Sequence, residues 1–355
     1  MSGQFEQSLR TALQPASVAP LLWHLTDADG TLLGFAAIDR IVAGRSCGGI
    51  RAAPEVTADE IARIARVMTL KCGFVGLASG GAKGGVIVPA HFTAEQRTAR
   101  LSAYGRAVSA LLRCGVWSHG ADLGTTDVDI ARIRHAAGIG PEPSAEMARA
   151  QTAAIDLSSG TAAGLTVALA TEAALESLGI ELRGARIALQ GAGAVGRAAI
   201  AALAARGARI VAVATRAGTL HDDHGLNVPG LLEASRRVGD AFTAGSAPPQ
   251  SVLRARCDAL LLCAGSDAID SASAAAIDAR AVICGANIPF TDEVGAQIGA
   301  RGILVIPDFV AGGGGVLGST LFSVAGITVK ELEGILRRQF KMRVARTIAQ
   351  ARARR

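Results

Sequence analysis

One glycine motif limits the folds open to this chain more than any other feature. Residues 185–215 follow the pattern strand, glycine turn, helix, strand, and the turn carries Gly191, Gly193 and Gly196 as G-x-G-x-x-G. In that setting the first glycine makes the turn, the second lets a pyrophosphate approach, and the third packs the helix on the strand. The N-terminus of the helix then holds the phosphates. The motif therefore predicts a parallel α/β domain that binds a dinucleotide.

Three more apolar runs follow this unit and end in glycine or polar residues: CDALLLCAG, AVICGAN and ILVIPDF. Buried strands of a doubly wound sheet end in this way at the ligand cleft. The 355 residues are enough for two domains. We predict an α/β chain with an N-terminal α/β substrate domain at 1–150 and a doubly wound Rossmann domain at 151–327. The helical segment 328–355 is expected to pack back on the first domain.

The end of the second strand in this unit selects the dinucleotide. An acidic residue there binds the ribose 2′-hydroxyl of NAD. This chain instead has Ala214, Thr215 and Arg216, and the last two can donate to or pair with a phosphate. We therefore expect NADP to be preferred over NAD, unless an acidic residue reaches the site from elsewhere in the chain.

The stretch 46–85 predicts a site for a small anion. Thr57 begins a helix that runs to Val75, and its apolar residues recur at helical spacing, with Lys71 near the end. A glycine-rich loop, GGAKGG, then presents Lys83 ahead of a predicted strand, VIVPA. The spacing is not that of a Walker A loop. Glycine-lined backbone beside two lysines suits an anionic substrate, although Lys71 alone would also suit the helix C-terminus.

Composition excludes several other classes of function. The net charge of +6 lies largely in the last helix, and no basic motif with interleaved aromatic residues accompanies it, so a nucleic-acid partner is not expected. No apolar run approaches the ~20 residues that span a bilayer, and the N-terminus lacks a signal-peptide pattern. Six scattered cysteines favour a reducing cytoplasmic location without disulfides or a metal site. The segment HDDHG at 221–225 is expected to be a surface loop.

With Asp122 in DLGTT, the motifs follow a familiar order: GGIR, MTLK, GGAKGG, DLGTT, TAAG, GAGAVG, GAN and PDxxAxxGGV. This order resembles the glutamate/leucine/phenylalanine/valine dehydrogenase family over roughly residues 30–320. The length and the segment LLGFAAIDRIV are most like those of leucine dehydrogenases. The resemblance implies an NAD(P)-dependent homo-oligomeric enzyme that interconverts an amino acid with its 2-oxo acid and ammonia.

The resemblance also implies roles for individual residues. Lys71 would bind the substrate α-carboxylate, Lys83 would be the catalytic lysine, and Asp122 would exchange a proton with the amino group. A lysine crowded by another cation should titrate nearer neutrality, where it can act as an acid or a base. Cys47, Gly48, Gly49, Met68 and Gly120 would line the substrate pocket. The expected cofactor contacts are Thr161, Gly191, Gly193, Ala194, Val195, Gly196, Thr215, Arg216, Ala264 and Asn287.

The sequence departs from the family pattern at several of these positions. Cys47 replaces the lysine that holds the side-chain carboxylate in glutamate dehydrogenases, which predicts a substrate with an uncharged side chain. The asparagine that usually follows the first lysine is Cys72, and the asparagine usual in the glycine-rich segment is Gly312. The main hypothesis is therefore an L-amino acid dehydrogenase for a nonpolar substrate. Gly312 motivates an alternative, a specialised reductase of an unusual amino or imino acid. A catalytically silent nucleotide-binding regulator is the non-enzymatic alternative.

Overall fold

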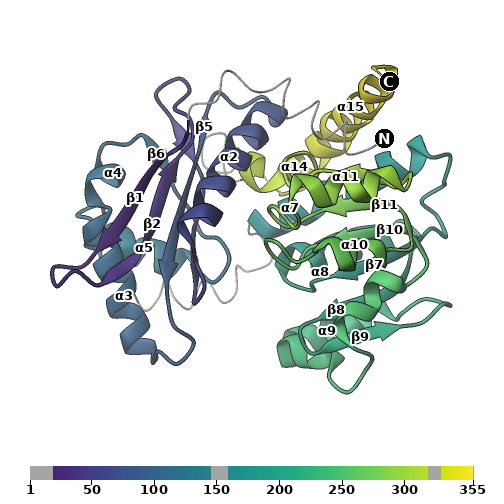
Figure 1. Ribbon diagram of the computed structural model, residues 1–355, viewed down its shortest axis with the longest axis horizontal. Coiled ribbons are helices and arrows are strands. Elements are labelled where there is room, and N and C mark those ends of the chain that lie inside the picture. Colours follow the sequence, from purple (N-terminus) through teal and green to yellow (C-terminus); the bar gives the residue numbers. More distant parts are fainter. Residues whose placement is uncertain (1–18, 145–158, 319–328, 355) are drawn as a thin grey trace. The chain divides into compact units, whose positions relative to one another are not determined.

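A computed structural model describes residues 19–144, 159–318 and 329–354 of the chain. The described residues up to 144 form one compact unit, and those from 159 onward form a second (Figure 1). Both units are α/β, and the second has the predicted Rossmann topology, so the predicted fold class is confirmed. No helix in the described ranges has the length and apolar character needed to cross a membrane.

The first unit is built on a six-stranded sheet in the order β1-β2-β5-β3-β6, and β4 also pairs with β5. Strands β1 and β2 form an antiparallel hairpin, β2 is antiparallel to β5, and β3 and β4 are parallel to β5. Strand β5 therefore lies at the centre of the sheet. The strands are β1 (Leu21–Thr26), β2 (Leu32–Ile38), β3 (Ser46–Cys47), β4 (Ile50–Ala53), β5 (Gly80–Ile87) and β6 (Trp117–Ser118).

Helices cover both faces of this sheet (Figure 1). They are α2 (Ala58–Val75), α3 (Ala94–Ala107), α4 (Ser109–Arg113) and α5 (Asp127–Ala136). Helix α2 begins at the predicted cap, where the Thr57 side chain accepts a hydrogen bond from the Glu60 N–H. Val108 (φ −91, ψ 2) separates α3 from α4. The cap of α5 is Thr126, with Asp129 completing a capping box.

The glycine-rich segment around Lys83 is a strand, so the prediction of a loop was wrong. Glycine is a poor strand former by itself, but in β5 the missing side chains let neighbouring layers approach. A Cβ on Gly81 would lie 2.1 Å from the Ala65 carbonyl oxygen of α2, and one on Gly84 would lie 2.7 Å from the Tyr104 hydroxyl of α3. Alternate residues of β5 therefore face α2 and α3, and Lys83 shares the α2 side with Gly81.

The second unit contains a six-stranded sheet in the order β12-β11-β10-β7-β8-β9. All neighbouring strands are parallel except β9, which is antiparallel to β8. The three apolar runs predicted as strands are β10, β11 and β12. The strands are β7 (Arg186–Gln190), β8 (Arg209–Thr215), β9 (Gly218–His221), β10 (Cys257–Leu262), β11 (Ala279–Cys284) and β12 (Leu304–Ile306).

Short and long helices flank this second sheet (Figure 1). They are α7 (Ser159–Ser177), α8 (Ala194–Ala204), α9 (Val228–Val238), α10 (Ser271–Ala275), α11 (Asp292–Ala300) and α12 (Asp308–Ala311), with 3₁₀ turns η2 (Gly239–Thr243) and η3 (Pro249–Arg254). Buried aliphatic side chains of β8, β10, β11 and η3 form one continuous core cluster. This packing fixes the strand ends from which cofactor contacts are expected.

The C-terminal helical segment packs on α7 of the second unit. It comprises α14 (Val329–Ile335), the π-helical turn η4 (Leu336–Phe340) and α15 (Lys341–Ala353). The Lys341 ammonium group lies 2.6 Å from a carboxylate oxygen of Glu176, and Arg352 donates to the Ser177 carbonyl at 2.5 Å. The expected packing of this segment on the first domain stays a prediction.

Candidate active site

A buried polar contact fixes how α2 and β5 present the two lysines. The Thr69 hydroxyl donates to Asp39 at 2.5 Å and accepts a hydrogen bond from the Gly81 N–H at 2.9 Å. Lys71 lies two residues beyond Thr69 on the helix, and Lys83 lies two residues beyond Gly81 on the strand. The contact therefore holds the helix and the strand in one register, close to both lysines.

Lys83 and Asp122 form an ion pair in which the lysine is buried and the carboxylate is partly exposed. The Lys83 Nζ lies 2.8 Å from Oδ2 of Asp122, and Lys83 is 1% exposed. Burial disfavours the charged ammonium group and lowers the pKa of Lys83 to about 8, although the Asp122 carboxylate opposes this shift. The positive charges of Arg51 and Lys71 lower the same pKa. Lys83 is thus placed to gain or lose a proton near neutral pH, as the sequence led us to expect.

Asp122 keeps its negative charge in this setting. Burial alone would raise its pKa, but the charges and hydrogen bonds of Lys83 and Arg51 hold the pKa well below the usual range. The Asp122 N–H donates to the Thr125 hydroxyl at 2.9 Å, and that hydroxyl donates to the Ile50 carbonyl at 2.7 Å. Thr125 therefore links Asp122 to strand β4 through these two hydrogen bonds.

Arg51 is a site residue that the sequence did not assign. Its Nε donates to Oδ2 of Asp122 at 3.1 Å, and its terminal nitrogen forms an ion pair with Glu60. The Glu60 N–H donates to the Thr57 cap of α2, while the Glu60 side chain pairs with Arg51. No neighbouring residue signals this contact in the sequence, because Asp122 lies 71 residues further along the chain.

The glycine pair in GGIR is packed against protein. A Cβ on Gly48 would lie 1.6 Å from the Ala82 carbonyl oxygen, and one on Gly49 would lie 2.9 Å from the Asp122 Cβ. Both glycines therefore allow β3, β4, β5 and the Asp122 segment to approach one another closely. Their expected role in contacting substrate directly stays a prediction.

The remaining expected pocket residues lie around the glycine pair of Gly48 and Gly49. Cys47 ends β3 and is partly exposed, and its Sγ lies 3.2 Å from the Sγ of buried Cys72. Met68 is buried on α2 beside Gly48. At Gly120 an added Cβ would have no described heavy atom within 4 Å. Lys71 is 6% exposed, and its charge lowers the pKa values of both Lys83 and Cys47.

The second unit has the geometry of a dinucleotide site. Gly191 adopts φ +94, and a Cβ there would lie 2.5 Å from the Ala264 N. A Cβ on Gly196 would lie 2.1 Å from the Gly191 carbonyl oxygen, whereas around Gly193 no described heavy atom would come within 4 Å. Gly193 precedes α8, whose first turn contains Ala194 and Val195. Open backbone at a helix N-terminus fits a pyrophosphate group.

The structure separates the roles of the two residues at the end of β8. The Thr215 hydroxyl is buried, donates to the Asp240 carbonyl at 2.9 Å and lies 2.6 Å from the Thr243 hydroxyl. The Arg216 side chain is 95% exposed and lies 3.1 Å from the Asp240 carboxylate. Arg216 therefore has the accessible charge, while Thr215 is engaged within the domain.

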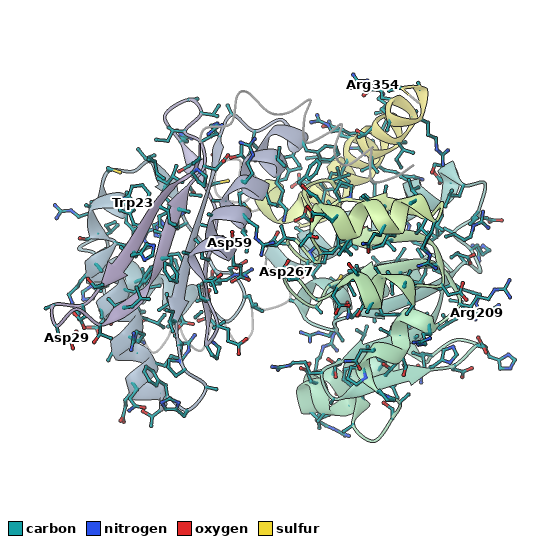
Figure 2. All side chains as sticks on the ribbon, in the orientation of Figure 1. Trp23, Asp29, Asp59, Arg209, Asp267 and Arg354 are labelled. Carbon is teal, nitrogen blue, oxygen red and sulfur yellow. The ribbon has the colours of Figure 1, made fainter. Side chains whose placement is uncertain are left out.

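Asn287 precedes a strained residue in the loop that follows β11. Ile288 has φ +41, which is rare for a β-branched side chain. Buried Asp308 accepts a hydrogen bond from the Ile288 N–H at 2.7 Å, and the Ile288 carbonyl accepts one from the Asp267 N–H at 2.8 Å. Asp267, labelled in Figure 2, also has a positive φ of 50. Such strain, held by surrounding contacts, is typical of ligand sites. Thr161 lies in the first turn of α7.

Family models match both units of the chain. Residues 157–350 match the family model "Glutamate/Leucine/Phenylalanine/Valine dehydrogenase", and residues 18–136 match "Glu/Leu/Phe/Val dehydrogenase, dimerisation domain". The chain belongs to the glutamate/leucine/phenylalanine/valine dehydrogenase family. It is 30% identical over 292 residues to the NAD-specific glutamate dehydrogenase of Staphylococcus aureus (strain COL), covering 81% of this chain and 70% of the relative.

Solved structures of family members are also similar. The hetero-hexameric glutamate dehydrogenase of Thermus thermophilus in its Leu-bound form has a TM-score of 0.75 and 28% identity, covering 97% of this chain and 87% of that chain. The L-tryptophan dehydrogenase of Nostoc punctiforme shares the fold, with a TM-score of 0.59 and 21% identity over 96% and 90% of the two chains. This member of the family is an NAD(P)-dependent amino acid dehydrogenase that catalyses oxidative deamination.

Within the described ranges, no group of three or more histidine, cysteine, aspartate or glutamate residues is placed to hold a metal ion. Asp223 of the HDDHG segment lies 3.5 Å from His221 and also forms an ion pair with Arg186. These contacts give the Asp223 side chain two partners within the protein.

Proposed function

We propose that this dehydrogenase acts on an amino acid with a nonpolar side chain. Cys47 carries the proposal, because the resemblance to glutamate dehydrogenases places at this position a lysine that holds the substrate side-chain carboxylate. A glutamate side chain would lose that partner here, and leaving a carboxylate unpaired in a partly buried pocket is costly. Buried Met68 and the open space at Gly120 suit an apolar group of some size. A particular likeness to leucine dehydrogenases, expected from the length and the segment LLGFAAIDRIV, belongs to the same proposal, while the relatives from Staphylococcus aureus and Thermus thermophilus are glutamate dehydrogenases.

The chain's own side chains divide the chemistry among them. We assign Lys71 to the substrate α-carboxylate, which it would hold as a point charge. Asp122 exchanges a proton with the amino group, and Lys83 takes a proton from the attacking water at Nζ and later returns it. Held at the glycine turn around Gly191 and Gly193, a bound NAD(P) would supply the hydride-accepting chemistry of the oxidative direction. Overall, amino acid, oxidised cofactor and water give 2-oxo acid, ammonium ion, reduced cofactor and a proton.

A panel of 2-oxo acids with ammonia and reduced cofactor tests the substrate class. We expect turnover with branched or aromatic oxo acids and little with 2-oxoglutarate. Cys47→Lys should gain activity with 2-oxoglutarate, whereas Cys114→Lys should not, because Cys114 is an exposed cysteine outside the site. Wild-type activity confined to 2-oxoglutarate would overturn the proposal. Including cyclic imines in the panel tests the alternative that Gly312 motivates, a reductase of an unusual imino acid.

We further propose that NADP is the preferred cofactor. The support is the exposed Arg216 guanidinium at the end of β8, which can pair with a 2′-phosphate. The NAD-specific relative from Staphylococcus aureus favours the opposite choice, and Asp240 beside Arg216 could accept from ribose hydroxyls. Titrating NADPH and NADH against wild type and Arg216→Asp decides between them. We expect the variant to lose NADPH affinity selectively, and equal losses for both cofactors would contradict the assignment.

We also propose that the enzyme is a homo-oligomer in a reducing cytoplasm. The matched dimerisation-domain model and the exposed leucines Leu21 (59%) and Leu22 (38%) on edge strand β1 support self-association. The six cysteines are free thiols, which suits a reducing compartment. Light scattering should give a multiple of 35.9 kDa, and Leu21→Glu should lower that multiple.

A further inference from the structure

Two cysteines meet beside the proposed substrate site. The Cys47 Sγ on β3 lies 3.2 Å from the Cys72 Sγ on α2, although 25 residues separate them in sequence. Cys47 is partly exposed and Cys72 is fully buried. Both occupy positions where the sequence departs from the family pattern, so the pair is a feature of this chain. The contact joins the strand that leads into Gly48 to the helix residue that follows Lys71.

The two thiols differ in reactivity. The hydrogen bond with Cys72 lowers the pKa of Cys47, and the positive charges of Lys83 and Lys71 lower it further. The same hydrogen bond, together with burial, raises the pKa of Cys72. Cys47 therefore carries more thiolate character and is the one open to solvent, which are the two properties of a reactive cysteine. Cys72 remains a protonated thiol, and its sulfur lies 3.2 Å from the Cys47 sulfur.

We propose that Cys47 and Cys72 form an oxidisable dithiol site that a hydroperoxide converts to a disulfide, with loss of enzyme activity. The Cys47 thiolate attacks the peroxide, the O–O bond breaks, and Cys47 becomes a sulfenic acid. The departing hydroxide or alkoxide takes up the proton that the Cys47 thiol released and leaves as water or an alcohol. The Cys72 sulfur then attacks the Cys47 sulfur, the S–O bond breaks, and the departing hydroxide takes the Cys72 proton as water. Two thiols are oxidised and one peroxide is reduced.

Closing the bond would move parts of the site. A disulfide requires a sulfur separation of about 2.05 Å, so the present 3.2 Å must shorten. The Cys47 side chain would turn toward α2, and the end of α2 that carries Lys71 would be drawn toward β3. Because the interior is close-packed, neighbouring side chains cannot absorb this movement, and the affinity for the substrate should fall. The dinucleotide site lies in the second unit and should be unaffected.

Peptide mapping without reductant tests the site directly. After limited hydrogen peroxide, the wild type should yield a peptide that joins Cys47 to Cys72 with the loss of two hydrogen atoms. Activity should fall in step with that peptide and return with dithiothreitol. Cys114→Ser, which removes an exposed thiol elsewhere, should form the link and lose activity as the wild type does. Cys72→Ser should form no link and should instead accumulate sulfinic acid on Cys47.

Several outcomes would overturn the proposal. One is oxidised Cys114 in the wild type without any link between Cys47 and Cys72, and another is a complete link with unchanged activity. If Cys72→Ser does not fold, Cys47→Ser replaces it, and thermal melting reports the folding of each variant. The mass measurement needs no substrate, so an error in the proposed substrate class would not affect it.

Discussion

The ammonium nitrogen of Lys83 lies 2.8 Å from Oδ2 of Asp122, and Arg51 donates to the same oxygen at 3.1 Å. One carboxylate oxygen of Asp122 is thus in contact with two cationic side chains. A carboxylate with two cationic partners stays ionised, and the two cations disfavour each other's charge. Because only lysine among them can release its proton at moderate pH, the arrangement directs titration to Lys83.

Replacing either lysine should separate catalysis from binding. In Lys83→Ala, kcat for oxidative deamination should fall by about 10²–10⁴, because a positioned acid–base group contributes that much. In Lys71→Ala, KM for the amino acid should rise more than kcat falls, since an anchor for the carboxylate acts in both ground and transition states. Steady-state kinetics measure both effects. Similar changes in kcat and KM for the two variants would contradict the assigned roles.

The pH profile should reveal Lys83. Oxidative deamination needs the neutral amine, so kcat/KM should rise with pH through a limb near the Lys83 pKa of about 8. The Arg51 charge lowers that pKa, and Arg51→Met should therefore move the limb to higher pH. Glu60→Gln keeps the Arg51 charge and serves as the control, in which no upward shift is expected. A limb that stays in place in Arg51→Met would argue against Lys83 as the titrating group.

Stability should also depend on Lys83 in alkaline solution. Its pKa is about 8 in the folded protein against an ordinary value of 10.5, so the unfolded chain binds more protons between these two pH values. The free energy of unfolding should therefore increase with pH across this window, and Lys83→Met should lose that contribution. Urea denaturation at a series of pH values measures it. Parallel curves for wild type and variant would contradict the shift.

Glycine substitutions should separate close packing from ordinary helix propensity. In Gly49→Ala the new methyl group would lie 2.9 Å from the Asp122 Cβ and 2.8 Å from the Ala121 carbonyl oxygen, so we expect a loss of about 1–3 kcal/mol in the free energy of unfolding. Gly73→Ala in α2, where no described heavy atom would lie within 4 Å, should gain roughly 0.5–1 kcal/mol. Thermal melting distinguishes the two, and a stable Gly49→Ala enzyme would refute the packing argument.

Asp308 should matter for the cofactor through Ile288. Without the hydrogen bond to the Ile288 N–H, the strained segment after Asn287 should relax, and cofactor affinity should fall in Asp308→Ala. Ile288→Gly accepts the positive φ without strain and should lose less affinity than Asp308→Ala. Fluorescence titration with reduced cofactor gives both dissociation constants. Unchanged affinity in Asp308→Ala would show that the contact is structural only.

Local signals in the sequence were sufficient for part of this fold. Helix α2 followed from its cap at Thr57 and its apolar period, and the glycine turn at Gly191 followed from its place between a strand and a helix. Both patterns depend on residues close together in the chain. The same holds for the three late strands of the second sheet, which are continuous apolar runs.

Other features depend on residues far apart and were missed. Strand β5 looked like a loop because its glycines have low strand propensity, and pairing with β2, β3 and β4 makes it a strand. Arg51 gave no local sign of its contact with Asp122, 71 residues away. The contact of the Thr215 hydroxyl with the Thr243 hydroxyl, 28 residues later, likewise had no local sign, and Thr215 as a cofactor contact stays a prediction.

The bare backbone of β5 has a consequence for engineering this enzyme. The strand that carries Lys83 contributes few side chains of its own near that lysine, whereas the proposed specificity residues Cys47, Met68 and Gly120 belong to other segments. Mutagenesis libraries at those three positions can therefore vary what the pocket accepts without altering the strand that holds the proton-transfer group. The chain is accordingly a suitable starting point for evolving enzymes that make amino acids from new 2-oxo acids.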